Sequence, residues 1–271
     1  MKIFKNKEQL KSEIGNKKSI SFVPTMGGLH KGHISLIKTA KKYRNETLVS
    51  IYVNPRQFNN KEDYKKYPSN LAKDLKILKK LKVNYLYLPT YKDLFKFKPS
   101  HRIYLHKFVK KLCGKYRKNH FKGVLDVINR FLEIIRPKYL FLGLKDFQQL
   151  TLIQKHTLKN KILTKIISCK TVRDPSGIAY SSRNFNLSKN QMKIAKNVYS
   201  YLIKIKKKTK NNLRLFNSAL FKKDLMKIGV NKIDYLEIID KKTLEKPKKN
   251  DVSFNIFIAY YLNKVRLIDN I

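Results

Sequence analysis

The sequence predicts an α/β protein in which a Rossmann-like, doubly wound parallel sheet precedes a smaller C-terminal α+β domain. Three observations support this fold class. Short apolar runs such as "KSISFVPTM", "TLVSIYVNP" and "NYLYLP" alternate with stretches of helical periodicity, which is typical of parallel strands joined by right-handed helical crossovers. A glycine-rich turn, "TMGGLHKGH", links the first run to a helix. Beyond about Ser176 the pattern changes to two helices followed by three strands.

The first three strands are expected at residues 18–26, 47–55 and 84–89, because each is a short apolar run bounded by proline or glycine. A helix is expected from about Lys31, and the side chains that it turns inward are Ile34, Leu36, Ile37 and Ala40. A second amphipathic helix is indicated by leucines at i, i+4, i+7 and i+10, namely Leu71, Leu75, Leu78 and Leu81.

The alternation resumes after an irregular, basic middle section. A helix with apolar residues between Val124 and Ile135 stops at Pro137, and the strand "KYLFLG" ends at Gly143. A helix over residues 146–158 and the strand "TKIISCK" complete the predicted sheet.

A boundary near Ser176 divides the expected domains. Residues 1–176 would form the catalytic domain, and residues 177–271 a smaller domain that closes over the site. The smaller domain is expected to hold helices over residues 188–209 and 213–228 and the strands "DYLEIID", "VSFNIFIAYYL" and "VRLID".

The chain carries 62 Lys and Arg against 18 Asp and Glu, a formal net charge of +44. Clustered cations of this kind can bind nucleic acid by releasing condensed counterions. However, the lysines are spread almost evenly from Lys2 to Lys264, and Lys, Asn, Ile, Phe and Tyr are all abundant. This bias is typical of an A/T-rich genome, so we favour compositional drift over a selected nucleic-acid surface.

The cysteines, Cys113 and Cys169, form neither a CxxC pair nor a disulfide framework. The N-terminus "MKIFKNKEQL" lacks the apolar core of a signal peptide, and apolar runs such as "IFIAYYL" are too short to span a bilayer. A cytoplasmic protein is expected.

Two histidines, His30 and His33, lie in the glycine-rich turn where the first strand gives way to a helix. The N-terminus of a helix favours an anion, and Gly27, Gly28 and Gly32 let the backbone approach it closely. The imidazoles, expected at a solvent-facing turn, add hydrogen-bond donors. This set of hydrogen-bond donors suits a nucleotide phosphate better than zinc, because no Glu, Asp or Cys with ligand spacing accompanies the histidines.

Five motifs in order, "PTMGGLHKGH", "VNPRQF", "HFKGV", "LGLKDFQQL" and "SSRN", resemble the pantothenate synthetase (pantoate–β-alanine ligase) family. The resemblance runs from about Val23 to the terminal "VRLIDN". The histidine motif alone would indicate only the wider nucleotidyltransferase superfamily that includes class I aminoacyl-tRNA synthetases. "NPRQF" and "KDFQQL" support the narrower family.

The resemblance implies a ligation in two steps. The pantoate carboxylate attacks the α-phosphorus of ATP to give pantoyl adenylate and pyrophosphate, and the amine of β-alanine then displaces AMP. The resemblance also implies Mg²⁺ with ATP and a homodimer, and it implies no specific nucleic-acid or membrane partner.

Site residues follow from matching positions in the motifs. The catalytic set implied by the resemblance is His33 as proton donor, with His30, Lys145 and Arg183. Gln57 and Gln149 match the glutamines that hold pantoate, β-alanine is expected beside Gln57, and Asp146 would help to position Mg²⁺. The implied ATP site comprises Met26, Gly27, Gly28, Leu29, His30, Lys31, Gly32, His33, Gly143, Leu144, Lys145, Asp146, Val172, Tyr180, Ser181, Ser182 and Arg183.

Three positions depart from the family pattern. Leu144 stands where Glu is usual, Lys31 where an acidic residue is typical, and Cys113 where Glu is common. The segment before His120 also lacks the usual proline and glycine of "RPGH". The resemblance places that loop at the dimer contact and the site wall.

Other functions stay open at the level of sequence. A related adenylyl- or cytidylyltransferase acting on another small acid would keep the histidine turn and lose the two glutamines. A basic RNA-binding protein on an old nucleotide fold would need its lysines concentrated on one face. A decaying gene product could keep the motifs without activity.

Overall fold

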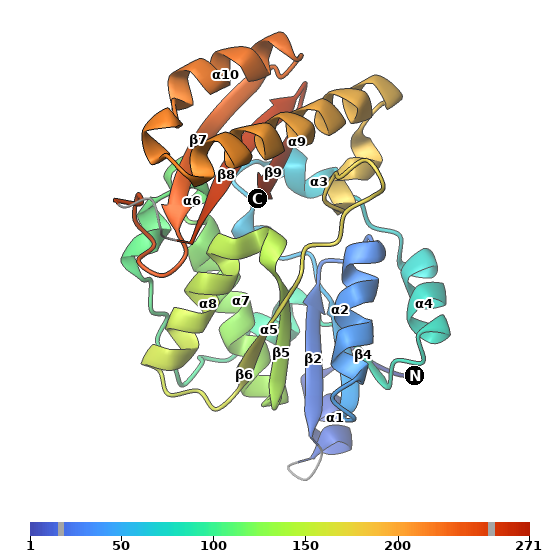
Figure 1. Cartoon of the computed structure of the whole chain (residues 1–271). Coiled ribbons are helices and arrows are strands. Elements are labelled where there is room, and N and C mark those ends of the chain that lie inside the picture. The colour runs from blue at the N-terminus through green and yellow to red at the C-terminus, as the bar shows by residue number, and fades with distance from the viewer. Residues whose placement is uncertain (16–18, 249–252) are drawn as a thin grey trace. The chain divides into compact units, whose positions relative to one another are not determined.

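The computed structural model describes residues 1–15, 19–248 and 253–271. These residues form two compact units, one of residues 1–110 and 117–172 and the other of residues 111–116 and 173–271 (Figure 1). Lys18 and Val252, which the predicted strands include, lie outside the described residues.

A six-stranded, fully parallel sheet forms the centre of the first unit in the described part of the chain, with the strand order β1-β4-β3-β2-β5-β6. Its strands are β1 (Lys2–Phe4), β2 (Ile20–Thr25), β3 (Glu46–Ile51), β4 (Tyr85–Tyr87), β5 (Tyr139–Gly143) and β6 (Lys165–Cys169). The order reverses between β2 and β5, since β3, β4 and β1 follow on one side and β6 on the other. In open α/β sheets ligands bind at such a switch point, outside the carboxyl ends of the strands.

Helices and short 3₁₀ turns connect these strands. They are α1 (Lys7–Ile14), α2 (Lys31–Lys41), η1 (Pro55–Gln57), α3 (Lys61–Lys65), α4 (Leu71–Lys80), α5 (Tyr91–Phe95), η2 (Lys107–Lys110), α7 (His120–Ile135), η3 (Leu144–Asp146) and α8 (Phe147–Lys159).

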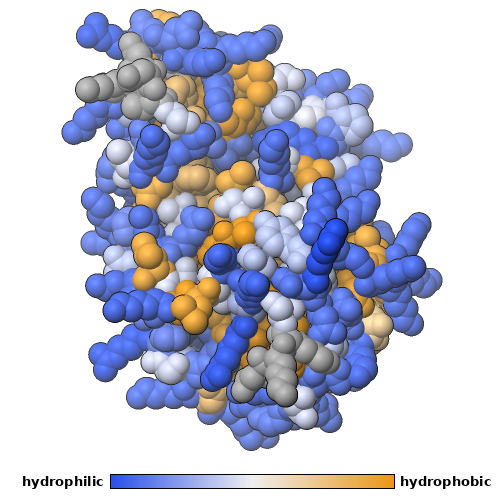
Figure 2. Space-filling model, turned by 60° about the horizontal axis from the view of Figure 1, so that its bottom comes forward, coloured by the Kyte–Doolittle hydropathy of each residue, from blue (hydrophilic) through white to orange (hydrophobic). Residues whose placement is uncertain are grey.

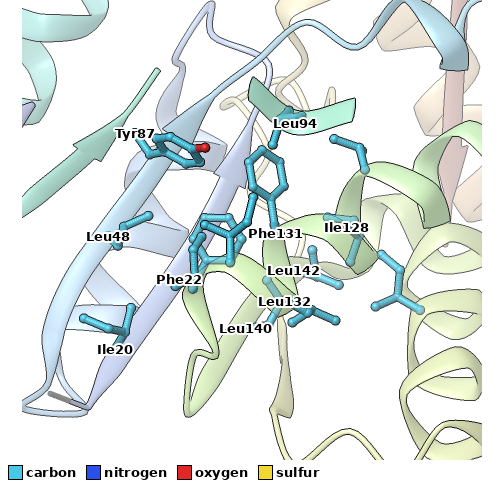
Figure 3. Packing of buried hydrophobic residues seen from close by; sticks show 14 of the residues in the cluster. Ile20, Phe22, Leu48, Tyr87, Leu94, Ile128, Phe131, Leu132, Leu140 and Leu142 are labelled. Atoms are coloured by element: carbon cyan, nitrogen blue, oxygen red, sulfur yellow. The ribbon is translucent and has the colours of Figure 1, made fainter. Parts of the chain in front are cut away.

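Both faces of the parallel sheet are buried, and alternate residues of each strand serve opposite faces. Phe22, Leu48 and Leu140 pack with α1, α7 and α8, as Figure 3 shows for part of this cluster. Val23 and Val49, the next residues along their strands, pack with α2 and α4 on the other side. This arrangement explains why the strands read as continuous apolar runs.

The second unit pairs an antiparallel sheet with two helices. Its elements are α6 (Cys113–Tyr116), η4 (Ser182–Asn186), α9 (Lys189–Lys210), η5 (Leu213–Leu215), α10 (Ser218–Lys227), β7 (Lys232–Asp240), β8 (Phe254–Leu262) and β9 (Val265–Asn270). The strand order is β7-β8-β9. Apolar side chains of α9 and α10, such as Leu202 and Leu225, pack against Leu236 and Ile258 of the sheet.

The predicted fold class is confirmed: a doubly wound parallel sheet is followed by a smaller α+β part. The first three predicted strands are shorter in the structure than expected, with bounds Ile20–Thr25, Glu46–Ile51 and Tyr85–Tyr87. The largest shift of a strand end is at β3, which ends at Ile51 because the chain then turns into η1. Among the helix residues expected to point inward, Ile37 and Ala40 are fully buried, whereas Ile34 and Leu36 are half-buried and Leu71 is exposed.

The compact units differ in one respect from a simple division near Ser176. The first unit ends at Val172, and residues 111–116 group with the second. Contacts of that segment explain the grouping: Lys111 Nζ bonds to the carbonyl of Leu244 (3.1 Å), and Cys113 Sγ lies 3.0 Å from Tyr235 Oη. Assignment of catalytic and closing roles to two domains stays a prediction.

Figure 2 shows one face of the molecule, on which hydrophilic residues predominate and hydrophobic residues form small, separate patches. Within the described residues no helix has both the length and the apolar character needed to cross a bilayer.

Candidate active site

The turns after β2 and β5 leave the sheet at its switch point. Because β2 and β5 are neighbouring parallel strands, their carboxyl ends meet at the same edge. The glycine-rich turn that follows β2 and the 3₁₀ turn η3 that follows β5 therefore lie side by side. The structure thus brings together His30, His33 and Lys145, which sequence motifs more than 100 residues apart predicted as site residues.

Two consecutive glycines form the turn after β2. Gly27 and Gly28 have φ angles of 77° and 61°, in the left-handed region that favours glycine. A Cβ on Gly27 would lie 3.0 Å from Asp74 Oδ2 and 3.1 Å from Ile51 Cγ2, so the space is closed as well. Both conformation and packing therefore require glycine at position 27.

The backbone N–H groups of this turn already donate within the chain. Gly28 donates to Asp74 Oδ2 (2.9 Å) and Leu29 to Asp74 Oδ1 (2.8 Å). Gly27 donates to Thr25 Oγ1 (3.2 Å), and Gly32 donates to His30 Nδ1 (3.1 Å). We expected these glycines to let the backbone approach an anion. In the structure their N–H groups bond to protein acceptors instead, which leaves the recognition of an anion here mainly to side chains.

Hydrogen bonds at Nδ1 define the tautomers of the two histidines. His30 Nδ1 accepts from Gly32, and His33 Nδ1 accepts from the N–H of His30 (3.4 Å). Each neutral ring therefore carries its hydrogen on Nε2. The ring centroids are 4.0 Å apart. The sequence predicted a solvent-facing turn, but both residues are half-buried, because each also caps the start of α2.

Burial and nearby positive charge keep both imidazoles neutral. Burial, followed by the charge of Lys145, lowers the pKa of His30 to about 4, and Asp146 partly opposes this shift. The pKa of His33 is well below its usual value because of burial, then His30 and then Lys145. Near neutral pH the two rings act as neutral N–H donors.

Lys145 and Asp146 supply charge beside the histidines. They occupy η3, directly after Gly143 at the end of β5, and Lys145 Nζ lies 3.3 Å from Asp146 Oδ1. Leu144 packs, partly buried, against the core. The carboxylate of Asp146 is half-exposed, so it can reach a cation in solvent.

Gln57 lies beside the same turn. It ends η1 and is 8% exposed, and its Nε2 donates to Sδ of Met26 (2.6 Å). Its backbone carbonyl accepts from His120 Nδ1 (2.7 Å) and Arg117 Nη2 (3.2 Å). The side-chain oxygen of Gln57 has no part in these bonds.

The other residues predicted from the motifs are placed as follows. Gln149 is half-buried on α8, and its neighbour Gln148 is buried and donates to the carbonyl of Phe108 (2.8 Å). Lys31 is the exposed first residue of α2, and Val172 is the last residue of the first unit.

Tyr180, Ser181, Ser182 and Arg183 belong to the second unit. Ser181 Oγ accepts from the N–H of Arg183 (3.3 Å) and caps η4. Arg183 Nη1 donates to the carbonyl of Arg266 (3.0 Å) on β9. The bond from Arg183 attaches the "SSRN" segment to the sheet of its own unit.

No cluster of three or more His, Cys, Asp or Glu suitable for a metal ion occurs in residues 1–15, 19–248 and 253–271. The site chemistry fits a cation that a substrate carries, with one carboxylate such as Asp146 as a protein ligand, which is how Mg²⁺ commonly binds with nucleotides.

Sequence reasoning missed several residues that hold the site. Asp74 is 1% exposed and holds the glycine turn, while Asn54 Nδ2 donates to the carbonyl of Gly123 (2.9 Å). A signal for Asp74 was present: it lies three residues after Leu71 and four before Leu78, on the apolar face of an amphipathic helix. A charged residue on such a face is unusual and indicates a specific partner.

Known proteins resemble the chain over nearly its whole length. A family model described as pantoate-beta-alanine ligase matches residues 2–271. The pantothenate synthetase of Endomicrobium trichonymphae is 40% identical, covering 100% of this chain and 97% of that protein. The pantothenate synthetase of Flavobacterium psychrophilum is 38% identical, covering 98% of this chain and 95% of the relative.

Solved structures give the same result. A crystal structure of pantoate-beta-alanine ligase from Francisella tularensis, complexed with beta-gamma ATP and beta-alanine, has a TM-score of 0.83 at 39% identity, covering 100% of this chain and 97% of that chain. Pantothenate synthetase from Thermus thermophilus has a TM-score of 0.91 at 28% identity, covering 100% of this chain and 99% of that chain. The family match over nearly the whole length and these relatives lead to one conclusion: the chain belongs to the pantoate-beta-alanine ligase family.

Proposed function

We propose that the protein joins pantoate and β-alanine to form pantothenate, with ATP cleaved to AMP and pyrophosphate through a pantoyl adenylate. The observation that carries this proposal is the meeting of two neutral histidines and Lys145 at the switch point of the sheet, beside Gln57. Side chains of this kind can bind a polyphosphate and a polar organic acid next to each other.

In the first step a carboxylate oxygen of pantoate forms a bond to the α-phosphorus as the bond to the pyrophosphate oxygen breaks. Negative charge then grows on the α-phosphate and on the leaving pyrophosphate. Fixed donors that face this charge stabilise the transition state, typically by a factor of about 10²–10³ for one donor. His30 and His33 would donate through Nε2–H, and Lys145 would add positive charge.

The role of His33 is narrower in this proposal than general acid catalysis. A ring with so low a pKa holds no extra proton to release near neutral pH. His33 would therefore stabilise charge through a hydrogen bond, without transferring its proton. Arg183 and the hydroxyls of Ser181 and Ser182 would complete the phosphate contacts.

Amide side chains would hold pantoate. Gln57 and Gln149 each offer two N–H donors and a carbonyl acceptor, which suits hydroxyl groups and a carboxylate without adding a competing nucleophile. In the second step the amine of β-alanine, bound beside Gln57, attacks the acyl carbon. The amine loses a proton, and AMP leaves with the electrons of the broken C–O bond.

Mg²⁺ would enter with ATP and neutralise part of the charge on the phosphates. Asp146 would serve as its protein ligand. Assembly as a homodimer is a further part of the proposal and rests on the family resemblance.

The test is an assay of pyrophosphate release with ATP and Mg²⁺, in which pantoate and β-alanine are added separately and together. We expect release to require pantoate, and pantothenate to form only when β-alanine is also present. Equal release with other small acids would favour a related nucleotidyltransferase. No release in any mixture, by a protein that binds ATP, would indicate a fold without this activity.

A further inference from the structure

Asp74 has an environment that no catalytic role explains. It lies on α4 and is 1% exposed, and its two carboxylate oxygens accept the N–H groups of Gly28 and Leu29, 46 and 45 residues earlier in the chain. Burial of a carboxylate costs free energy unless hydrogen bonds compensate for lost hydration. Burial raises the pKa of Asp74, and the two backbone bonds oppose that shift.

The helix that carries Asp74 does not need this carboxylate as a cap. Asn70 already caps α4, since its Oδ1 accepts the N–H of Lys73 (2.9 Å). Asp74 is the fourth residue of the helix, and its side chain extends to the turn after β2. Its hydrogen bonds therefore serve that turn and not its own helix.

The turn that Asp74 holds has the form of an anion-binding site. Successive backbone N–H groups in left-handed or turn conformations create a concavity that binds anions such as phosphate. Gly27 and Gly28 have this conformation, and the N–H groups of Gly28 and Leu29 converge on one carboxylate. A carboxylate of the chain occupies the place that a phosphate takes in many nucleotide-binding turns.

We propose that Asp74 is a positioning residue of the adenylation site: it fills the backbone anion site of the turn after β2, fixes the turn, and so directs the phosphates of ATP to His30, His33 and Lys145. This inference rests on the proposed function for the identity of the reaction. Its binding part does not, because it concerns where the triphosphate lies.

The hydrogen bonds of Asp74 restrict the position of the two histidines through the backbone of the turn. Leu29, held by Asp74 Oδ1, immediately precedes His30, whose N–H bonds to His33 Nδ1. A turn that lost Asp74 would lose the carboxylate that accepts the N–H groups of Gly28 and Leu29. If the turn then moved or bound the phosphates itself, the phosphates would be displaced from the imidazoles.

The decisive variant is Asp74→Asn. Asparagine has the shape of aspartate but offers one acceptor oxygen, so its NH₂ group would face one of the two backbone N–H donors. We expect the rate of pyrophosphate release to fall roughly 10- to 100-fold and the Kd of a non-hydrolysable ATP analogue to rise at least about fivefold, on the scale of one stranded buried donor. The KM for pantoate should stay within about twofold. Asp74→Glu, which restores the charge on a longer side chain, should recover part of the rate.

Asp93→Asn is the matched control. Asp93 is another carboxylate of the first unit that accepts a distant backbone N–H, that of Lys7 (3.1 Å), and it also bonds to Tyr87 Oη. This variant should lower the thermal midpoint of unfolding. The rate of pyrophosphate release and the Kd of the ATP analogue should stay at their wild-type values. Backbone amide resonances of Gly28 and Leu29 should shift in Asp74→Asn and not in Asp93→Asn.

The proposal is overturned if Asp74→Asn lowers the thermal midpoint as Asp93→Asn does but keeps the wild-type rate and analogue affinity. If Asp74→Asn does not fold, Asp74→Glu and Asp74→Ser decide the question by the same two measurements. Failure of the proposed function is recognisable separately, because wild-type protein would then release no pyrophosphate with pantoate, while the analogue would still report on Asp74.

Discussion

In the turn after β2, a carboxylate accepts backbone N–H groups, whereas in the turn after β3, an imidazole and a guanidinium donate to a backbone carbonyl. Asp74 of α4 holds Gly28 and Leu29 in the first turn. In η1, the second turn, His120 and Arg117 hold the carbonyl of Gln57. In both turns a residue distant in sequence satisfies backbone groups.

The two turns also differ in why each needs a glycine. The first depends on glycines with positive φ angles. The second depends on the close approach of α7: a Cβ on Gly123 would lie 2.3 Å from the carbonyl oxygen of Arg56 and 2.9 Å from the nitrogen of Gln57. We infer that the turn after β2 is sensitive to both backbone conformation and volume, because a Cβ on Gly27 would also meet Asp74 and Ile51, and that η1 is sensitive to volume at Gly123.

The largest effect on activity should come from replacing His33, which follows the turn after β2. His33→Ala removes an Nε2–H donor, and we expect pyrophosphate release to fall about 10²-fold or more. A half-buried ring that also accepts a backbone N–H contributes to the turn, so circular dichroism must accompany the assay. His101→Ala, a histidine of the same unit outside the site, should keep the wild-type rate. An unchanged rate for His33→Ala would remove this residue from the proposed mechanism.

Gly123→Ala tests the volume dependence of the second turn. The new methyl group must displace η1 or α7, and such overpacking typically costs about 1–3 kcal/mol. We expect a lower thermal midpoint and a KM for pantoate raised at least about tenfold, with little change in analogue affinity. Gly143→Ala is the control for stability, since a Cβ there meets nothing within 4 Å. Equal loss of stability in both variants would contradict the packing argument.

Gln149→Ala and Lys145→Ala separate the two substrates. Loss of a neutral hydrogen-bonding partner costs about 0.5–1.5 kcal/mol, so Gln149→Ala should raise the KM for pantoate roughly 2- to 10-fold while the analogue binds as before. Lys145→Ala should weaken analogue binding measured without pantoate. If both variants changed analogue affinity alike, the proposed division of the site between ATP and pantoate would be wrong.

A smaller effect is expected from the imidazole that holds Gln57. Nε2 of His120 contacts Arg117 Nη1 (2.9 Å), and Nδ1 contacts the carbonyl of Gln57. Since arginine can only donate, the neutral His120 carries its hydrogen on Nδ1. His120→Asn, whose amide nitrogen can replace Nδ1, should keep the KM for pantoate within about threefold. His120→Gln places its amide nitrogen near Nε2 and should raise the KM more. The reverse order would show that the bond to Gln57 is not what matters.

The smallest effect on activity concerns pH. His30 is neutral above its pKa of about 4, so His30→Asn should leave the shape of the pH dependence of analogue affinity near pH 6.5 unchanged. Stability should respond, because the unfolded chain binds this proton at about pH 6.5 and the folded chain only near pH 4. Stability is therefore lost as pH falls from about 6.5 to about 4. His30→Asn should reduce the slope of the thermal midpoint against pH in this window, while His33, whose pKa is also lowered, maintains part of it. An unchanged slope would contradict the lowered pKa of His30.

Periodicity in the sequence was enough to predict most of the first unit. Residues such as Phe22 and Val23 occur in continuous apolar runs because both faces of the sheet are covered. β1 was missed because it has three residues, Lys2–Phe4, and pairs with β4 more than 80 residues later. No local pattern distinguishes so short an edge strand from a loop.

The residues of the candidate site also fall into two groups, those that a local motif predicts and those that only the packing reveals. Residues that read as a motif, such as His30 and His33, could be recognised because their spacing is local. Asp74 and His120 act across 46 and 63 residues, respectively. Their roles depend on which helix packs beside which turn, and this information appears only in three dimensions.

The grouping of residues 111–116 with the second unit has a practical consequence for dissecting the protein. A truncation at Val172 would keep this segment but remove Tyr235 and Arg266, against which the Cys113 thiol is buried. Such a fragment would expose the Cys113 thiol. A truncation series should therefore compare a fragment that keeps residues 111–116 with one in which a short polar linker replaces them. In the first fragment, a thiol reagent would report whether Cys113 has become exposed.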